Sequence, residues 1–158
     1  MTRSAAIARA AAFYDRGGFA AELARRVAFR TESQNPERAG ELERYLREEI
    51  APSLAALGCE CRCVANPAGA WPFLIARRAE PGNALTVLSY GHGDVIRGLE
   101  GQWHGGLDPW TLAPEGDRLY GRGTADNKGQ HTINLAALRA VLETRGRLGF
   151  DFVLVLET

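Results

Sequence analysis

Residues 84–94 read Ala-Leu-Thr-Val-Leu-Ser-Tyr-Gly-His-Gly-Asp, and the fold can be worked out from this stretch. Its first seven residues are apolar on both alternating faces, which is typical of a strand buried inside a sheet. The strand ends abruptly at Gly91, and two polar side chains, His92 and Asp94, follow at once. Open α/β sheets bind ligands at the carboxyl ends of their strands. We therefore expect a buried strand that carries a binding site at its end.

The segments on either side predict an α/β fold. Helices are expected over residues 5–29 with a break at Gly17-Gly18, over 36–57, and over 130–144. Further strands are expected over residues 59–64, 73–77 and 150–156. Asn35-Pro36 is a typical helix start, and Pro52 should kink or restart the second helix. A strand, a connection, a helix and a second strand indicate a parallel crossover, so we expect a mixed, largely parallel sheet flanked by helices.

The composition excludes several classes of protein. The 158 residues include 19 Lys plus Arg and 19 Asp plus Glu, so charge gives no reason to expect nucleic acid or an anionic membrane as a partner. Three cysteines crowd into residues 59–63, unlike the even, spread-out set of a secreted disulfide framework. No apolar run approaches the ~18–20 residues of a membrane span, and charged residues interrupt the Ala-rich N-terminus. A cytoplasmic protein is expected.

Two glycine-rich stretches do not match nucleotide-binding loops. Residues 91–96 lack the third glycine of the dinucleotide fingerprint, and residues 121–129 lack the Gly-Lys-Ser/Thr that reaches phosphate and magnesium. The Gly-x-Ser-x-Gly pattern of one class of serine hydrolase is also missing from the sequence. These patterns therefore favour neither nucleotide binding nor that kind of nucleophile.

His92, Asp94 and Asp126 are the candidate site residues. A histidine that binds a metal usually donates its other ring N–H to a carboxylate, and an aspartate two positions later could accept it. Simpler explanations stand beside this one: Asp94 could cap a loop histidine locally, and Asp126 could be the N-cap of the next helix. The long connection over residues 95–129 favours a function, because loops of this length are usually functional. Taken singly, these residues leave the simpler explanations open.

Together, the motifs resemble a known family. Gly91-His-x-Asp94 after a strand, then Asp108-Pro-Trp110, then Leu-Tyr-Gly-Arg-Gly-Thr-Ala-Asp-x-Lys-Gly over residues 119–129 before a helix, form an ordered set. This set is similar to that of the zinc metallopeptidases of the M20 family, which include dipeptidases, carboxypeptidases and amino-acid deacylases. The resemblance runs from residues 30–33 to the last strand, and it implies a zinc-peptidase-like catalytic domain.

The resemblance implies a centre of two zinc ions, for which cobalt or manganese could substitute. His92 would bind one ion and Asp126 would bridge both. Asp94 counts among the catalytic residues because it would orient His92. A cis peptide bond is implied between Asp126 and Asn127. The implied reaction is metal-assisted hydrolysis of an amide bond in a small peptide or an N-acyl amino acid.

The same resemblance implies that residues 1–158 are the N-terminal portion of a catalytic domain. The family places a Glu-Glu pair, a general base and a metal ligand, just after the strand that here ends in Glu157-Thr158, and Glu157 precedes that pair. Further ligands come from later sequence, as does the smaller lid domain through which members dimerise. We therefore expect this chain to be inactive by itself. Two alternatives remain: a truncated chain that acts as an interaction or regulatory module, and an α/β domain without metal.

Other residues are expected to have structural roles. His104 and His131 show no spacing typical of ligands, so we expect them in a loop and on a helix surface. Lys128 could hold the loop near Asp126 or be solvated, and we favour the second. Trp103 and Trp110 should pack the long connection against the sheet.

Overall fold

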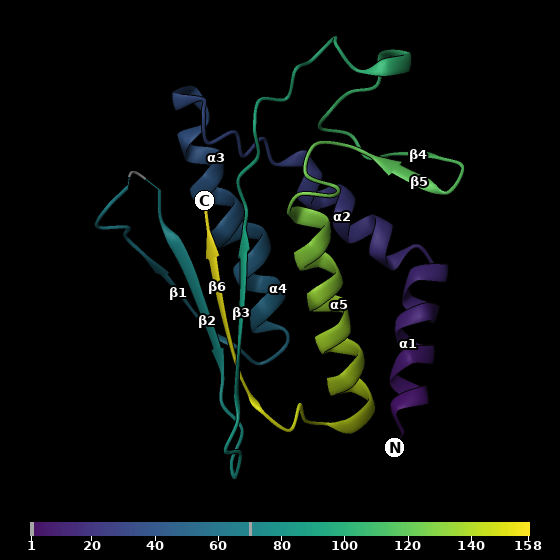
Figure 1. Cartoon of the computed structure of the whole chain (residues 1–158), viewed down its shortest axis with the longest axis vertical. Helices are drawn as coiled ribbons and strands as arrows, with labels where there is room; N and C mark the ends of the chain where they lie inside the picture. The colour runs from purple at the N-terminus through teal and green to yellow at the C-terminus, as the bar shows by residue number, and fades with distance from the viewer. Residues whose placement is uncertain (1, 70) are drawn as a thin grey trace.

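The computed structural model describes residues 2–69 and 71–158 and shows helices packed beside a sheet (Figure 1). The helical elements are α1 (Arg3–Asp15), α2 (Gly18–Ala28), η1 (Pro36–Arg38), α3 (Ala39–Arg44), η2 (Tyr45–Ile50), α4 (Ala51–Ala55), η3 (His104–Gly106) and α5 (Lys128–Arg145). The strands are β1 (Glu60–Val64), β2 (Phe73–Arg78), β3 (Thr86–His92), β4 (Ala113–Glu115), β5 (Arg118–Tyr120) and β6 (Asp151–Glu157). Within the described residues, none of the helices combines the length and the apolarity that crossing a membrane requires.

The main sheet has four strands in the order β1-β2-β6-β3. β3 and β6 pair in parallel, with Val87 opposite Phe152, and α5 forms the crossover between them, as the sequence predicts. The pairs β1–β2 and β2–β6 are antiparallel. The expectation of a mixed α/β sheet is therefore confirmed. The expectation that it is largely parallel is wrong for the described residues, because two of its three pairings are antiparallel.

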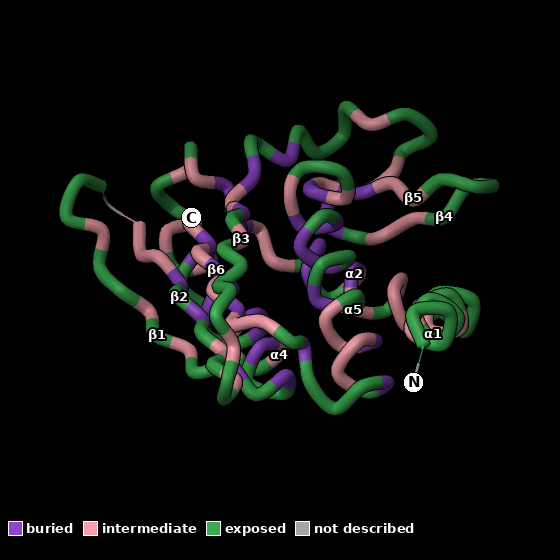
Figure 2. The backbone as a smooth tube through the Cα atoms, turned by 60° about the horizontal axis from the view of Figure 1, so that its bottom comes forward, coloured by how far each residue is buried: buried purple, intermediate pink, exposed green. Residues whose placement is uncertain are grey.

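β3 lies at the edge of this sheet and not in its interior. Leu88 is 68% exposed, and Leu85 and Tyr90 are also exposed (Figure 2). The prediction of a strand buried on both faces is therefore wrong for the part of the chain described. An apolar run indicates that both faces of a strand can be buried. It does not identify which other segment of the protein would bury them.

The helical region after Asn35 begins as predicted, and its hydrogen-bond pattern changes just before Pro52. The Asn35 side chain accepts a hydrogen bond from the Glu37 backbone N–H at 3.3 Å, which caps η1. Pro52 does not end the helix. Instead, the π-helical segment η2 precedes it, and the Ala51 N–H reaches back to the Leu46 carbonyl. A π-helical segment moves the side chains around it to new angular positions, and such segments are often found at functional sites.

The hydrophobic core lies between the helices and one face of the sheet. Along β6 every second residue is buried, and these residues are Phe152, Leu154 and Leu156. They pack against residues from β2 and from the helices. The buried members of this cluster are Tyr45, Leu46, Ile50, Leu54, Leu57, Cys59, Leu74, Ala76, Leu135, Leu148, Phe152, Leu154 and Leu156. The core therefore places the carboxyl ends of β3 and β6 next to the start of α5.

The long connection between β3 and α5 is held by its own side chains. The Trp103 indole N–H donates to the Gly98 carbonyl at 2.8 Å, and the Arg122 guanidinium lies 5.2 Å from the centre of the Trp103 ring. Trp110 is buried, and its indole N–H donates to the Glu100 carboxylate. These contacts are made within the connection, and the packing of both tryptophans against the sheet stays a prediction.

Replacing Leu135 with alanine should destabilise the fold strongly. Leu135 on α5 is 2% exposed and belongs to the core cluster, so Leu135→Ala should lower the free energy of unfolding by about 2–5 kcal/mol. Ile133 on the same helix is 56% exposed, and Ile133→Ala should change it by no more than about 0.5 kcal/mol. Urea unfolding of both variants measures the difference. Equal effects would contradict this placement of α5.

The stability of the chain should fall in acid through Glu80. Burial alone would raise the pKa of Glu80, but hydrogen bonds from the Gly149 and Leu148 N–H groups and from Arg78 outweigh it and lower the pKa to about 2. Because the folded pKa lies below the unfolded value of about 4.3, this stabilisation is present above that pH and is lost as pH falls towards 2.

Glu80→Gln should therefore lower the free energy of unfolding at pH 7, and its difference from wild type should shrink between pH about 4.3 and 2. Glu60 is exposed on β1, and Glu60→Gln serves as the control with little effect at either pH. Urea titrations at several pH values give the comparison. A difference that does not depend on pH would show that the hydrogen bonds to Glu80 do not stabilise its ionised form.

Candidate metal centre

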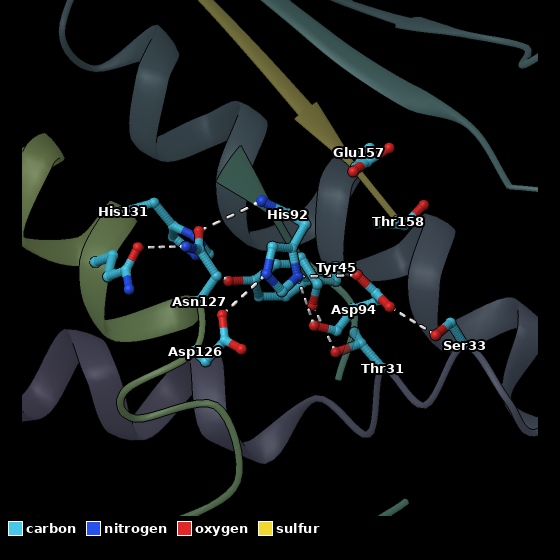
Figure 3. Close-up of polar contacts among 12 residues, drawn as sticks. Thr31, Ser33, Tyr45, His92, Asp94, Asp126, Asn127, His131, Glu157 and Thr158 are labelled. Atoms are coloured by element: carbon cyan, nitrogen blue, oxygen red, sulfur yellow. Dashed lines mark hydrogen bonds and ion pairs between the residues drawn. The ribbon is translucent and has the colours of Figure 1, made fainter. Parts of the chain in front are cut away.

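The three predicted site residues meet at the carboxyl end of β3 (Figure 3). His92 is the last residue of β3, Asp94 follows two positions later, and Asp126 lies in the loop that leads into α5. The Nδ1 atom of His92 lies 3.0 Å from Oδ1 of Asp94, and its Nε2 atom lies 3.0 Å from Oδ1 of Asp126. The parallel crossover brings these residues together, because the chain must return to the same end of the sheet before α5 begins.

The hydrogen-bond partners of His92 assign its ring proton. Nδ1 faces two acceptors, the carboxylate and the backbone carbonyl of Asp94, so Nδ1 carries a proton. In the neutral ring this leaves a lone pair on Nε2, which points at a carboxylate oxygen of Asp126. Two acceptors at 3.0 Å are compatible only if a positive charge, either a proton or a metal cation, lies with them. The arrangement therefore favours a positive charge between His92 and Asp126, supplied by a proton or by a metal ion.

The electrostatics of the site agree with this. Burial lowers the pKa of His92, but the hydrogen bond to Asp126 and the negative charge of Asp94 outweigh burial and raise the pKa above its ordinary value. The Asp126 side chain is 78% exposed, so solvent and solutes can reach the carboxylate. The site thus attracts positive charge and is open to it.

The loop before α5 has the predicted geometry at Asp126. The peptide bond between Asp126 and Asn127 is cis, as expected from the family resemblance. Asn127, and not Asp126, is the N-cap residue of α5, so the simpler explanation of Asp126 as a helix cap is wrong. The Asn127 side-chain carbonyl accepts a hydrogen bond from the His92 backbone N–H at 3.3 Å. This bond fixes the loop to the end of β3.

Thr31 and Ser33 support the site, although no sequence pattern predicted an individual role for either residue. The Ser33 hydroxyl donates to Oδ2 of Asp94 at 2.6 Å, on the oxygen that does not face His92. The Thr31 hydroxyl donates to the Gly93 carbonyl at 2.7 Å. Both residues lie in the segment where the family resemblance begins, but no spacing linked them to residues sixty positions later.

Two predictions about polar residues on α5 are wrong. Lys128 is fully buried, and its ammonium group donates to the Phe29 carbonyl at 2.6 Å. Burial lowers the pKa of Lys128 to about 7. His131 is also buried, and its Nε2 atom lies 2.5 Å from the Tyr45 hydroxyl. The partners of Lys128 and His131, the Phe29 carbonyl and the Tyr45 hydroxyl, lie far away along the chain and hold both side chains inside the fold. His104 is exposed, as expected.

Two side chains of the site, His92 and Asp126, offer donor atoms that fit a metal such as zinc. An imidazole nitrogen and a carboxylate oxygen are ordinary ligands of zinc, cobalt and manganese. In residues 2–69 and 71–158, no three His, Cys, Asp or Glu side chains are grouped so that they could hold a metal ion together. The cysteines on and beside β1 have free thiols and lie at the opposite edge of the sheet from His92. His92 and Asp126 are therefore the candidate ligands.

Comparison with known proteins connects this geometry to a family. Residues 88–158 match the family model described as peptidase family M20/M25/M40. Succinyl-diaminopimelate desuccinylase of Methylobacterium radiotolerans is 43% identical over 75 residues, which are 48% of this chain and 18% of that protein. Cysteinylglycine-S-conjugate dipeptidase of Corynebacterium striatum is 39% identical over 83 residues, or 51% of this chain and 18% of that protein.

Solved structures extend the similarity to nearly the whole chain. Human carnosine dipeptidase 1 matches with a TM-score of 0.86 and 26% identity, over 98% of this chain and 34% of that chain. The dipeptidase Dug1p of Saccharomyces cerevisiae has the same fold, with a TM-score of 0.81 and 20% identity. This chain thus spans about a third of the length of these structures and less than a fifth of the curated relatives named above. The chain is similar to the M20 family of metallopeptidases in the sequence of residues 88–158 and in its fold.

Proposed function

We propose that this chain forms part of a metal-dependent hydrolase of amide bonds, with His92 and Asp126 as metal ligands and Asp94 as the residue that orients His92. The observation that carries the proposal is the approach of His92 Nε2 to Asp126 Oδ1 at 3.0 Å while Nδ1 is held by Asp94. Zinc is the proposed metal, two ions are the proposed number, and cobalt and manganese are the alternatives.

The residues of this chain would prepare the site. Asp94 holds the proton on Nδ1 of His92 and so keeps the Nε2 lone pair available. Ser33 holds Asp94 through its second carboxylate oxygen. Asp126, on the exposed side, supplies a carboxylate with two oxygens, enough to bridge two ions. When bound, the metal would lower the pKa of a water molecule and polarise the scissile carbonyl group.

We also propose that residues 1–158 are the N-terminal portion of a catalytic domain in a longer polypeptide. Two ligands are too few for a catalytic zinc, which usually has three from the protein. The proposed general base, the further ligands and the smaller domain would lie outside these residues, and the chain alone would be inactive. The intact mass of the protein in its source cells tests this: a mass near 17.2 kDa would contradict it and favour a non-catalytic interaction module.

The proposed substrates are small peptides or N-acyl amino acids. The similar proteins are named succinyl-diaminopimelate desuccinylase, acetylornithine deacetylase and cysteinylglycine-S-conjugate dipeptidase, names that refer to acylated amino compounds and a dipeptide conjugate. Asp126-Asn127-Lys128-Gly129 and the likeness to carnosine dipeptidase 1 favour the dipeptidase side. Homodimer formation through the later domain and a cytoplasmic location are also part of the proposal.

Removing either proposed ligand should weaken zinc binding. His92→Gln and Asp126→Asn should each lower the affinity for zinc at least about tenfold, because each removes one of two ligands, and Asp94→Asn should lower it about 10–100-fold through the orientation of His92. Isothermal titration of the 158-residue chain with zinc measures these affinities, and the cobalt spectrum reports the change in ligands.

Two exposed residues outside the site provide the matched controls. His104→Gln and Asp117→Asn remove the same functional groups at surface positions and should leave the zinc affinity unchanged within about twofold. If His104→Gln weakened binding as much as His92→Gln does, the assigned ligand would be wrong. A full-length polypeptide that binds neither zinc nor cobalt would favour the non-catalytic alternatives.

A further inference from the structure

We propose that Tyr45 is a positioning residue for the candidate metal centre, because its buried ring sets where the His92-Gly93-Asp94 turn lies. The inference rests on the proposed function, since His92 is a proposed ligand. Tyr45 lies on η2, more than forty residues before this turn, and no sequence motif joins the two. Figure 3 draws Tyr45 in one view with His92 and Asp94, and its ring lies close to Gly93, the residue between these two in the chain.

The Tyr45 ring is held on several sides. It is fully buried, and its ring centre lies 5.5 Å from that of Phe29 in an edge-to-face arrangement. The Lys128 ammonium lies 5.0 Å from the centre of the ring. The hydroxyl is hydrogen-bonded to His131 Nε2. With α2, η2 and α5 all contributing to its surroundings, the ring is a fixed surface and not an adaptable one.

Gly93 meets this surface. A Cβ atom placed on Gly93 would lie 2.8 Å from both Cδ1 and Cε1 of Tyr45, closer than carbon atoms can approach. The backbone of Gly93 is not in the left-handed region, so close approach to Tyr45, and not backbone conformation, requires glycine here. The Gly93 backbone therefore rests against the Tyr45 ring.

Backbone hydrogen bonds hold the same residue from two other directions. The Gly93 N–H donates to the Glu157 carbonyl of β6 at 2.7 Å, and its carbonyl accepts from the Thr31 hydroxyl at 2.7 Å. A displacement of Gly93 would move His92 and Asp94 together, since they are its neighbours in the chain. Together with these hydrogen bonds, the Tyr45 ring determines the positions of His92 and Asp94.

His131 serves Tyr45 and not the metal. Its Nε2 atom is occupied by the Tyr45 hydroxyl, and its Nδ1 atom is buried with no hydrogen-bond partner among the described residues. Burial lowers the pKa of His131 to about 3, so the ring is neutral at pH 7. A neutral imidazole can hold the tyrosine hydroxyl without bringing a charge under the site.

The test uses Gly93→Ala in the metal-free chain and in the presence of zinc. The added methyl group should force the turn away from Tyr45. We expect the ¹⁵N signals of the His92 ring to move in the metal-free protein, and the zinc affinity to fall at least about tenfold. Gly40 on α3 has open space around the equivalent position, and Gly40→Ala is the control that should change neither measurement.

A second residue makes the test specific. In a Tyr45→Leu background the ring is absent. The loss of zinc affinity caused by Gly93→Ala should therefore be at least about fivefold smaller in this background than in wild type. In a Tyr45→Phe background the ring remains, and the cost should persist. If Tyr45→Leu does not fold, two measurements still test the positioning role: the effect of Gly93→Ala in the Tyr45→Phe background, and the ¹⁵N signals of the His92 ring in Gly93→Ala.

The outcomes separate this inference from the proposed function. Unmoved His92 ring signals in Gly93→Ala, or an equal loss of zinc affinity in the Tyr45→Leu background, would overturn the positioning role. A full-length polypeptide that binds no zinc would overturn the proposed function instead, while the ring signals of the metal-free 158-residue chain would still test Tyr45.

Discussion

The parallel pairing of β3 with β6 is the constraint on which the rest of this structure depends. Parallel neighbours cannot be joined by a tight turn, so the chain must leave the end of β3, cross over through α5 and return to the start of β6. That route brings the loop before α5 back to the carboxyl end of β3. As a result, Asp126 faces His92 although 34 positions separate them.

The site combines an open charged side with a closed polar side. On the open side, two carboxylates flank a single imidazole, an arrangement that requires a positive charge. On the closed side, buried polar side chains bind one another across the helices. Arg26 is fully buried, donates to Thr132 at 2.6 Å and forms ion pairs with Glu22 and Glu49. Buried charges are tolerated when partnered in this way. These contacts connect α2, η2 and α5 beneath the site and keep its support rigid.

Local patterns predicted much of this molecule. The helix break at Gly17, the cap at Asn35, the strand ends and α5 follow from residue types and spacing along a few turns of chain. The position of β3 at the sheet edge could not be predicted, because an apolar run does not identify the strands that pair with it. The burial of Lys128 and His131 did not follow either, because their partners lie on distant helices.

The α/β class, the crossover between β3 and β6, and the three residues proposed for the metal centre could be read from the amino-acid sequence, because periodicity and an ordered motif are local properties. The strand order and the groups that hold those residues in place, Thr31, Ser33 and Tyr45, became known only from the folded chain. Hydrogen bonds and close packing act between atoms that meet in space. Which atoms meet is settled by how the helices pack on the sheet.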